Sequence, residues 1–137
     1  MLSRYRSKER HEGGFSLIEL LVVILVIAIL AAIAIPAFLS QRKKGWVAQQ
    51  QSDLKNAATA AETYGAGNGG RYTGLDEGDL AANGFGGTSG VTVTVEAVSS
   101  IAYCLKGVHV PATTNWFYYS KVGDPRTGAG SDCSSLP

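Results

Sequence analysis

The sequence has few of the residues that build catalytic and metal sites. It contains two histidines, His11 and His109, and two cysteines, and their spacing is not that of a zinc site. No glycine-rich phosphate loop and no nucleophile–base pair can be recognised in the 137 residues. The formal net charge is only +1, which gives no reason to expect a nucleic-acid-binding protein. These scarcities favour a structural or binding role over an enzyme, with no metal and no cofactor.

Charge is also nearly absent from residues 15–39, where Glu19 is the single charged side chain. Leu20 to Leu39 is an apolar run of 20 residues. As a helix it measures about 30 Å, which matches the hydrocarbon thickness of a bilayer. Four basic residues precede this run, namely Arg4, Arg6, Lys8 and Arg10, and they favour a cytoplasmic N-terminus. Three more basic residues follow the run, namely Arg42, Lys43 and Lys44, so the difference in charge between the two ends is small. We therefore predict a single membrane-spanning helix.

Glu19 separates the interpretations of this helix. A cleaved secretory signal, with a small-x-small site at residues 32–34, and a plain uncut membrane anchor are alternatives, but neither explains an acid at the start of the span. A cut between Gly14 and Phe15 would create an α-amine, mostly protonated at neutral pH, one helical turn from Glu19. In side-by-side subunits the carboxylate of one could neutralise the amine of the next, which would also fix the register of the helices.

The string Gly14-Phe15-Ser16-Leu17-Ile18-Glu19-Leu20, the apolar run after it and Pro36 resemble the class III signal of type IV pilins and type II secretion pseudopilins. The resemblance covers residues 1–46. It implies that a prepilin peptidase removes residues 1–14 after Gly14 and methylates Phe15, and that Glu19 directs assembly. Pro36 cannot donate a hydrogen bond to the carbonyl of Ala32, so a kink or loosening is expected there.

The resemblance implies the α+β fold of type IV pilins, with residues 15–39 as transmembrane and assembly helix and 40–64 as its amphipathic continuation. Helical spacing places the apolar residues of this continuation on one stripe: Val47, Leu54, Ala57, Ala58 and Ala61. The polar residues Gln50, Asp53, Lys55 and Glu62 are expected on other sides of the helix. Residues 65–137 are the expected head. Its first part, 65–90, is predicted to be a loop because it holds 10 of the 17 glycines. The acids Asp76, Glu77 and Asp79 there fit a solvated loop better than a calcium site, since the spacing of a calcium loop is missing.

Three strands are predicted within residues 91–121. Val91–Val98 alternates, Ile101–Lys106 is its hairpin partner, and Trp116–Lys121 follows a loop with Pro111. An antiparallel sheet with one face on the helix is the expected product. Cys104 and Cys133, an even pair in an exported domain, suggest a disulfide that closes the C-terminal loop, with two free thiols as the alternative. Many type IVa pilins carry such a bridge.

The resemblance implies a pilus subunit that polymerises with other pilin subunits for adhesion, twitching motility or DNA uptake. Its other partners would be the prepilin peptidase, the assembly machinery of the inner membrane and, before assembly, lipid. The precursor would cross the cytoplasmic membrane once, with its leader in the cytoplasm, and then enter a surface filament. A pseudopilin of a type II secretion or competence system and a membrane-tethered binding domain that never polymerises are the alternatives.

Direct binding of single-stranded or duplex DNA is a further alternative for the C-terminal aromatics. Stacking on bases is plausible for a basic and aromatic set, here Trp116, Tyr118, Tyr119, Lys121 and Arg126. The core of a sheet explains most of these aromatics equally well.

Overall fold

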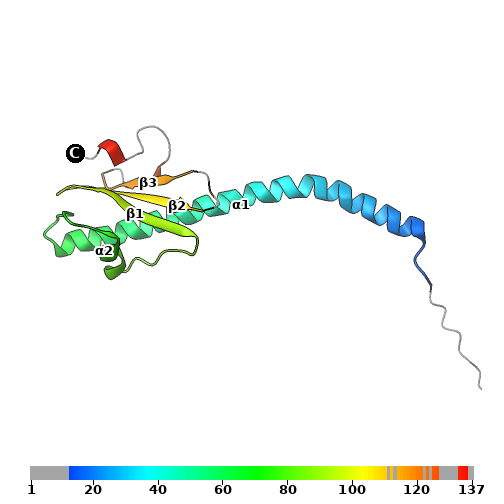
Figure 1. Cartoon of the computed structure of the whole chain (residues 1–137), viewed down its shortest axis with the longest axis horizontal. Helices are drawn as coiled ribbons and strands as arrows, with labels where there is room; N and C mark the ends of the chain where they lie inside the picture. Colours follow the sequence, from blue (N-terminus) through cyan, green and yellow to red (C-terminus); the bar gives the residue numbers. More distant parts are fainter. Residues whose placement is uncertain are drawn as a thin grey trace, which may run out of the picture. The chain divides into compact units, whose positions relative to one another are not determined.

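A computed structural model describes residues 13–110, 112, 114–121, 123, 125–126 and 133–135. Residues 1–12 of the predicted leader, with His11, and Pro111 of the predicted loop lie outside this part of the chain. The elements in order are helix α1 (Leu17–Gly67), helix α2 (Glu77–Ala82), strands β1 (Val91–Val98), β2 (Tyr103–His109), β3 (Trp116–Tyr119) and β4 (Pro125–Arg126), and a 3-10 turn, η1 (Cys133–Ser135) (Figure 1). The chain divides into two compact units, Met1–Phe38 and Leu39–Pro137.

The first unit consists, in its described part, of residues 13–16 and the beginning of α1. Every side chain from Phe15 to Phe38 is exposed except that of Ala31, which is half-buried. An 18-residue window of α1 has a mean hydropathy of 3.2 and is not buried at all, so its length and composition allow it to cross a bilayer. Pro36 lies inside α1, whose helical assignment continues through it. The predicted kink at Pro36 stays a prediction.

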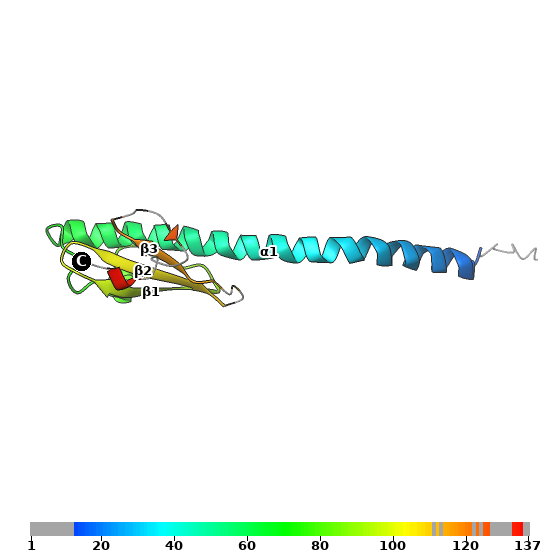
Figure 2. The ribbon, with the colours of Figure 1, turned by 90° about the horizontal axis from the view of Figure 1, so that it is seen from above.

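The second unit packs the later part of α1 on one face of an antiparallel sheet. The strand order is β1-β2-β3-β4, so each strand pairs with its neighbours in the sequence. In Figures 1 and 2 this part of α1 lies alongside the sheet, and the buried cluster joins Leu54 on α1 to Val93, Tyr103 and Leu105 on the strands. The predicted α+β fold is confirmed.

Small residues let the helix approach the sheet closely. Four alanines of α1 are at most 3% exposed: Ala57, Ala58, Ala60 and Ala61. Gly107 in β2 leaves room for Leu54, because a Cβ atom at Gly107 would lie 3.0 Å from Cγ of Leu54. Leu54 itself is 0% exposed. The helix–sheet distance is therefore set by side chains that are short on both surfaces.

The prediction that residues 65–90 form one loop was wrong in two places. α1 continues to Gly67, and residues 77–82 form α2. The carboxylate of Asp76 accepts a hydrogen bond from the N–H of Asp79 (2.9 Å), and that of Asp79 accepts one from the N–H of Asp76 (3.2 Å). This reciprocal capping box starts the helix, and the fully buried Leu80 holds it on the core.

The hairpin of β1 and β2 is confirmed, with β1 at its predicted bounds and a register shift between Val95 and Ala97. β2 begins two residues later than expected and continues to His109, and β3 ends at Tyr119 rather than Lys121. The short β4, which pairs with β3, was not predicted. Strand ends depend on pairing with neighbours, which periodicity within one strand does not report.

Candidate functional site

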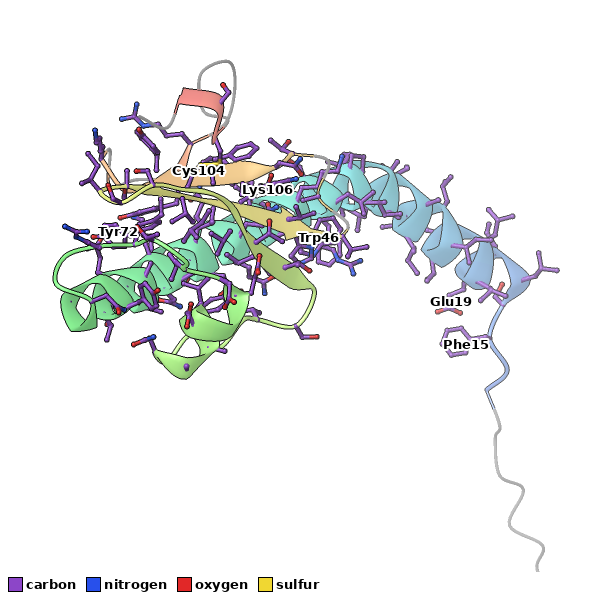
Figure 3. All side chains as sticks on the ribbon, turned by 60° about the vertical axis from the view of Figure 1, so that its left-hand side comes forward. Phe15, Glu19, Trp46, Tyr72, Cys104 and Lys106 are labelled. Atoms are coloured by element: carbon purple, nitrogen blue, oxygen red, sulfur yellow. A yellow bond between two sulfur atoms is a disulfide. The ribbon has the colours of Figure 1, made fainter. Side chains whose placement is uncertain are left out.

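The start of α1 gathers the residues singled out for processing and assembly. Phe15 is 82% exposed. The carboxylate of Glu19 accepts a hydrogen bond from the N–H of Ser16 at 3.4 Å, so it caps the first turn of its own helix. Figure 3 labels the side chains of Phe15 and Glu19 at this end of α1. Negative charge is favourable there because the free N–H groups of a helix start carry partial positive charge.

The geometry at this helix start leaves the Gly14–Phe15 bond accessible. Gly14 is exposed and precedes the helix, and a Cβ atom added at Gly13 or Gly14 would meet nothing within 4 Å. The structure thus brings Gly14, Phe15 and Glu19 to one exposed end of α1. Pro36 lies further along the same helix and the two cysteines lie in the second unit.

In the second unit, the structure joins Cys104 of β2 to Cys133 of η1 in a disulfide with a Cα–Cα distance of 5.6 Å. This is the pairing that the cysteine count indicated. The bridged residues are 29 apart in the sequence. In the loop-entropy description such a bridge stabilises the fold by roughly 3–4 kcal/mol, because it restricts the unfolded chain.

Two polar residues of α1 are buried, against the prediction that they lie off the core side. Gln50 is 0% exposed, and its Nε2 donates to the carbonyl oxygens of Gly107 (3.3 Å) and Thr114 (3.2 Å). Asp53 is 2% exposed and accepts hydrogen bonds from the N–H (2.7 Å) and Oγ1 (2.8 Å) of Thr88. These contacts satisfy polar groups of the loop before β1, of β2 and of the connection before β3. Hydrophobic periodicity could not reveal them.

Glu62, near the C-terminal end of α1, connects this helix to two tyrosines of the head. Its carboxylate accepts hydrogen bonds from the hydroxyls of Tyr72 (2.6 Å) and Tyr103 (2.8 Å). The bond to Glu62, followed by burial, raises the pKa of Tyr72 to about 12. Burial, followed by the bond to Glu62, raises the pKa of Tyr103 further. Both phenols therefore stay protonated as donors over the physiological range.

The other candidate sets are largely used for structure. Trp116 and Tyr118 pack against the core cluster, and the ring of Tyr118 stacks on that of Tyr103 with centroids 6.3 Å apart. Lys121 and Arg126 are exposed, so the suggested DNA-binding set is split between the core and the surface. Of the three clustered acids, Asp76 and Asp79 form the capping box of α2, and Glu77 accepts from the N–H of Val95 at 2.8 Å. No group of three or more metal-binding side chains occurs among the described residues.

Comparison with known proteins agrees with the features at the start of α1. Residues 10–35 match the prokaryotic N-terminal methylation motif. Over 109 residues the chain is 37% identical to the type IV wide pilus major component PilA4 of Thermus thermophilus. This match covers 79% of this chain and 81% of that protein.

Other relatives match over shorter lengths. The chain is 35% identical over 57 residues to type II secretion system core protein G of Pseudomonas aeruginosa, covering 42% of this chain and 40% of that protein. It is 44% identical over 52 residues to the type IV major fimbrial protein FimA of Dichelobacter nodosus, covering 38% of this chain and 33% of that protein. α1 ends at Gly67, so a match of 109 residues must also include part of the head. The matches of 57 and 52 residues are short enough to lie within residues 1–67.

Proposed function

The chain belongs to the type IV pilin family, and from this premise we propose that it is the structural subunit of a type IV pilus. The precursor is inserted in the cytoplasmic membrane with its leader in the cytoplasm, cut after Gly14 and N-methylated at Phe15. The mature subunit then polymerises through its N-terminal helix into a surface filament used for adhesion, twitching motility or DNA uptake.

The observation that carries the proposal is the combination of an exposed apolar helix with one acid at its start. From Leu20 to Leu39 no side chain is fully buried, so this surface needs lipid or other helices around it. Glu19 is the only charge in that environment, and its one hydrogen bond within the described residues comes from a backbone N–H. A carboxylate in an apolar bundle requires a cation, which the cut at Phe15 supplies on each subunit.

Processing is tested by intact mass spectrometry of the mature chain. We expect a first residue at Phe15 and a mass about 14 Da higher than that of the unmodified chain, from one methyl group. Gly14→Val should block the cut, whereas the same substitution one position earlier, Gly13→Val, is the matched control. Neither position has an atom of the chain within 4 Å of an added Cβ atom, so a difference between the variants reports the peptidase and not folding. A mature chain that begins at Met1 or Ile35 would contradict the proposal.

The filament is tested by electron microscopy of a strain in which this chain is the only major subunit. We expect surface filaments that contain the chain and that disappear on its deletion. A second candidate, a secretion pseudopilin, is favoured by the 35% identity to core protein G. It predicts loss of protein secretion on deletion, with no long surface filament at natural expression levels.

A further inference from the structure

Three consecutive cations, Arg42, Lys43 and Lys44, follow the apolar run directly and are all exposed. No acidic residue occurs in the sequence between Glu19 and Asp53, so their charge is not balanced locally. Among the residues that the structure describes, neither lysine has an acid within salt-bridge distance. We refer to Arg42, Lys43, Lys44 and the nearby Trp46 as the juxtamembrane basic cluster.

Trp46 gives this cluster a fixed geometry. The guanidinium of Arg42 lies over the Trp46 ring, 5.1 Å from its centroid, as expected for residues four apart on a helix. The ring also stacks on His109 at the end of β2, with centroids 5.6 Å apart. His109 is 5% exposed and its Nε2 lies 3.2 Å from Oε1 of Gln49. Trp46 is half-buried, so one part of the indole is covered by the head and another part is accessible.

The cluster lies at the level of lipid headgroups when Leu39 is at the edge of the hydrocarbon. At about 1.5 Å per residue, Arg42 to Lys44 stand roughly 4–8 Å beyond that edge. The headgroup layer on each side of a bilayer is about 5–7 Å thick. Side chains on a helix lean toward its N-terminus, so the indole of Trp46 covers the level of Arg42 and not that of its own Cα. Tryptophan and basic residues are both favoured at this depth.

The charges of the cluster are not explained by membrane insertion. Basic residues flanking a span are favoured on the cytoplasmic side, so three cations at the exported end oppose the orientation that the leader favours. A compensating interaction after insertion would remove that cost. The anions available at this depth, on every side of the helix, are the phosphates of lipid headgroups.

We propose that the juxtamembrane basic cluster binds anionic phospholipid headgroups in the outer leaflet of the cytoplasmic membrane. This rests on the membrane-inserted stage of the proposed function and adds a lipid partner to it. Arg42, Lys43 and Lys44 contact the phosphates, and Trp46 lies among the headgroups beside Arg42. The contact holds the head at the membrane surface until the subunit is withdrawn into a filament.

The test uses the mature full-length chain in vesicles that mix phosphatidylcholine and phosphatidylglycerol. The sequence has two tryptophans, so Trp116→Phe leaves Trp46 as the only one. Quenching of Trp46 fluorescence by either lipid, brominated near the top of the acyl chain, gives the relative binding constant of the two lipids next to this residue. At low salt we expect a preference for phosphatidylglycerol, whose phosphate is not neutralised by a choline, of about fivefold for each cation that contacts it. High salt should reduce it.

The triple variant Arg42→Gln, Lys43→Gln, Lys44→Gln should lower that preference to near one. The matched control removes three exposed positive charges elsewhere in the head: Arg71→Gln, Lys121→Gln and Arg126→Gln. It should keep the preference. Inorganic phosphate at the concentration of the lipid should not reduce it, because the proposed ligand is a headgroup held at the membrane surface.

Equal quenching by the two lipids in the unsubstituted chain, or an unchanged preference in the triple variant, would overturn the proposal. Competition by free phosphate would also overturn it, since the cluster would then be a soluble anion site. The outcome is independent of polymerisation, which is measured separately as filament yield. A chain that forms no pili but prefers phosphatidylglycerol would contradict the pilus function and leave the lipid contact standing.

Discussion

The two halves of α1 form one continuous helix, but their side chains differ in burial. Up to Phe38, large aliphatic side chains such as Leu25 and Ile33 are 55% and 72% exposed. Beyond Leu39, the buried residues of α1 are Gln50 and Asp53, then a single leucine, Leu54, followed by four alanines and Gly65. The more apolar half therefore has no partner within the described chain, and the less apolar half is packed.

This contrast separates two uses of hydrophobic sequence. In the later half, small side chains and hydrogen-bonded polar groups fit one particular sheet, so the packing is complete within one subunit. In the earlier half, bulky aliphatic residues cover all sides of the helix, as in a segment surrounded by lipid or by other helices. Glu19 belongs to the earlier half, and among the described residues its carboxylate is hydrogen-bonded only to the N–H of Ser16.

The largest expected effect comes from Glu19→Val. Insertion and cleavage should continue, because the change makes the span more apolar and the cut precedes the pairing. Removing one member of a buried ion pair costs about 3–5 kcal/mol, so each subunit contact should weaken by about two to four orders of magnitude. Filament yield from sheared cells, compared with the membrane pool of processed subunit, measures this.

The control for Glu19 is the exchange Glu19→Leu with Leu20→Glu. It keeps the composition of the span but moves the carboxylate by about 100° around the helix. Filaments should be lost here too. A normal yield from either variant would show that the position of the acid does not direct assembly.

Reduction of the Cys104–Cys133 bridge should be the next largest effect and should be confined to the head. The double variant Cys104→Ala, Cys133→Ala is expected to lose roughly 3–4 kcal/mol of head stability. Denaturant unfolding in detergent, monitored by near-ultraviolet circular dichroism, measures the free energy of unfolding of the head. Two thiols that react in the native, unreduced chain would contradict the bridge.

The same substitution in both halves gives a matched comparison. Leu54→Ala removes a fully buried side chain and should destabilise the head by about 2–5 kcal/mol. Leu25→Ala, at a position 55% exposed, should change head stability by less than about 0.5 kcal/mol. Equal effects in the same unfolding measurement would mean that the two halves are not energetically separate.

The smallest effect concerns pH. The pKa of Tyr72 is raised from 10.0 to about 12, first by its hydrogen bond to the Glu62 carboxylate. A raised folded pKa means that the stabilising contribution is complete below pH 10 and is lost as the pH rises through about 12. Ultraviolet titration of the tyrosines should show two late-titrating phenols, Tyr72 and the still later Tyr103, and both should titrate earlier in Glu62→Gln. Tyr72→Phe should remove the component near pH 12 and leave the later one of Tyr103, so a component near pH 12 that persists in Tyr72→Phe would contradict the assignment.

What the sequence predicted depended on local patterns. Gly14 to Glu19, the apolar run and the alternation of Val91, Val93 and Val95 are contiguous signals, and they led to the helix, the first hairpin and the family. The capping pair Asp76 and Asp79 was also a local signal for α2, but the glycines around it obscured it.

What the sequence did not predict depends on distant partners. Asp53 is buried because Thr88, 35 residues later, donates two hydrogen bonds to it, and Gln50 meets carbonyls 57 and 64 residues away. The stack of Trp46 on His109 likewise joins α1 to the end of β2.

The most direct test of the assembly role of Glu19 is the filament structure at side-chain resolution. We expect the methylated amine of Phe15 in one subunit to lie within about 4 Å of the Glu19 carboxylate of a neighbour, the distance of an ion pair. An ordered filament in which that amine meets no carboxylate, while Glu19 contacts only Ser16 of its own chain, would contradict the account.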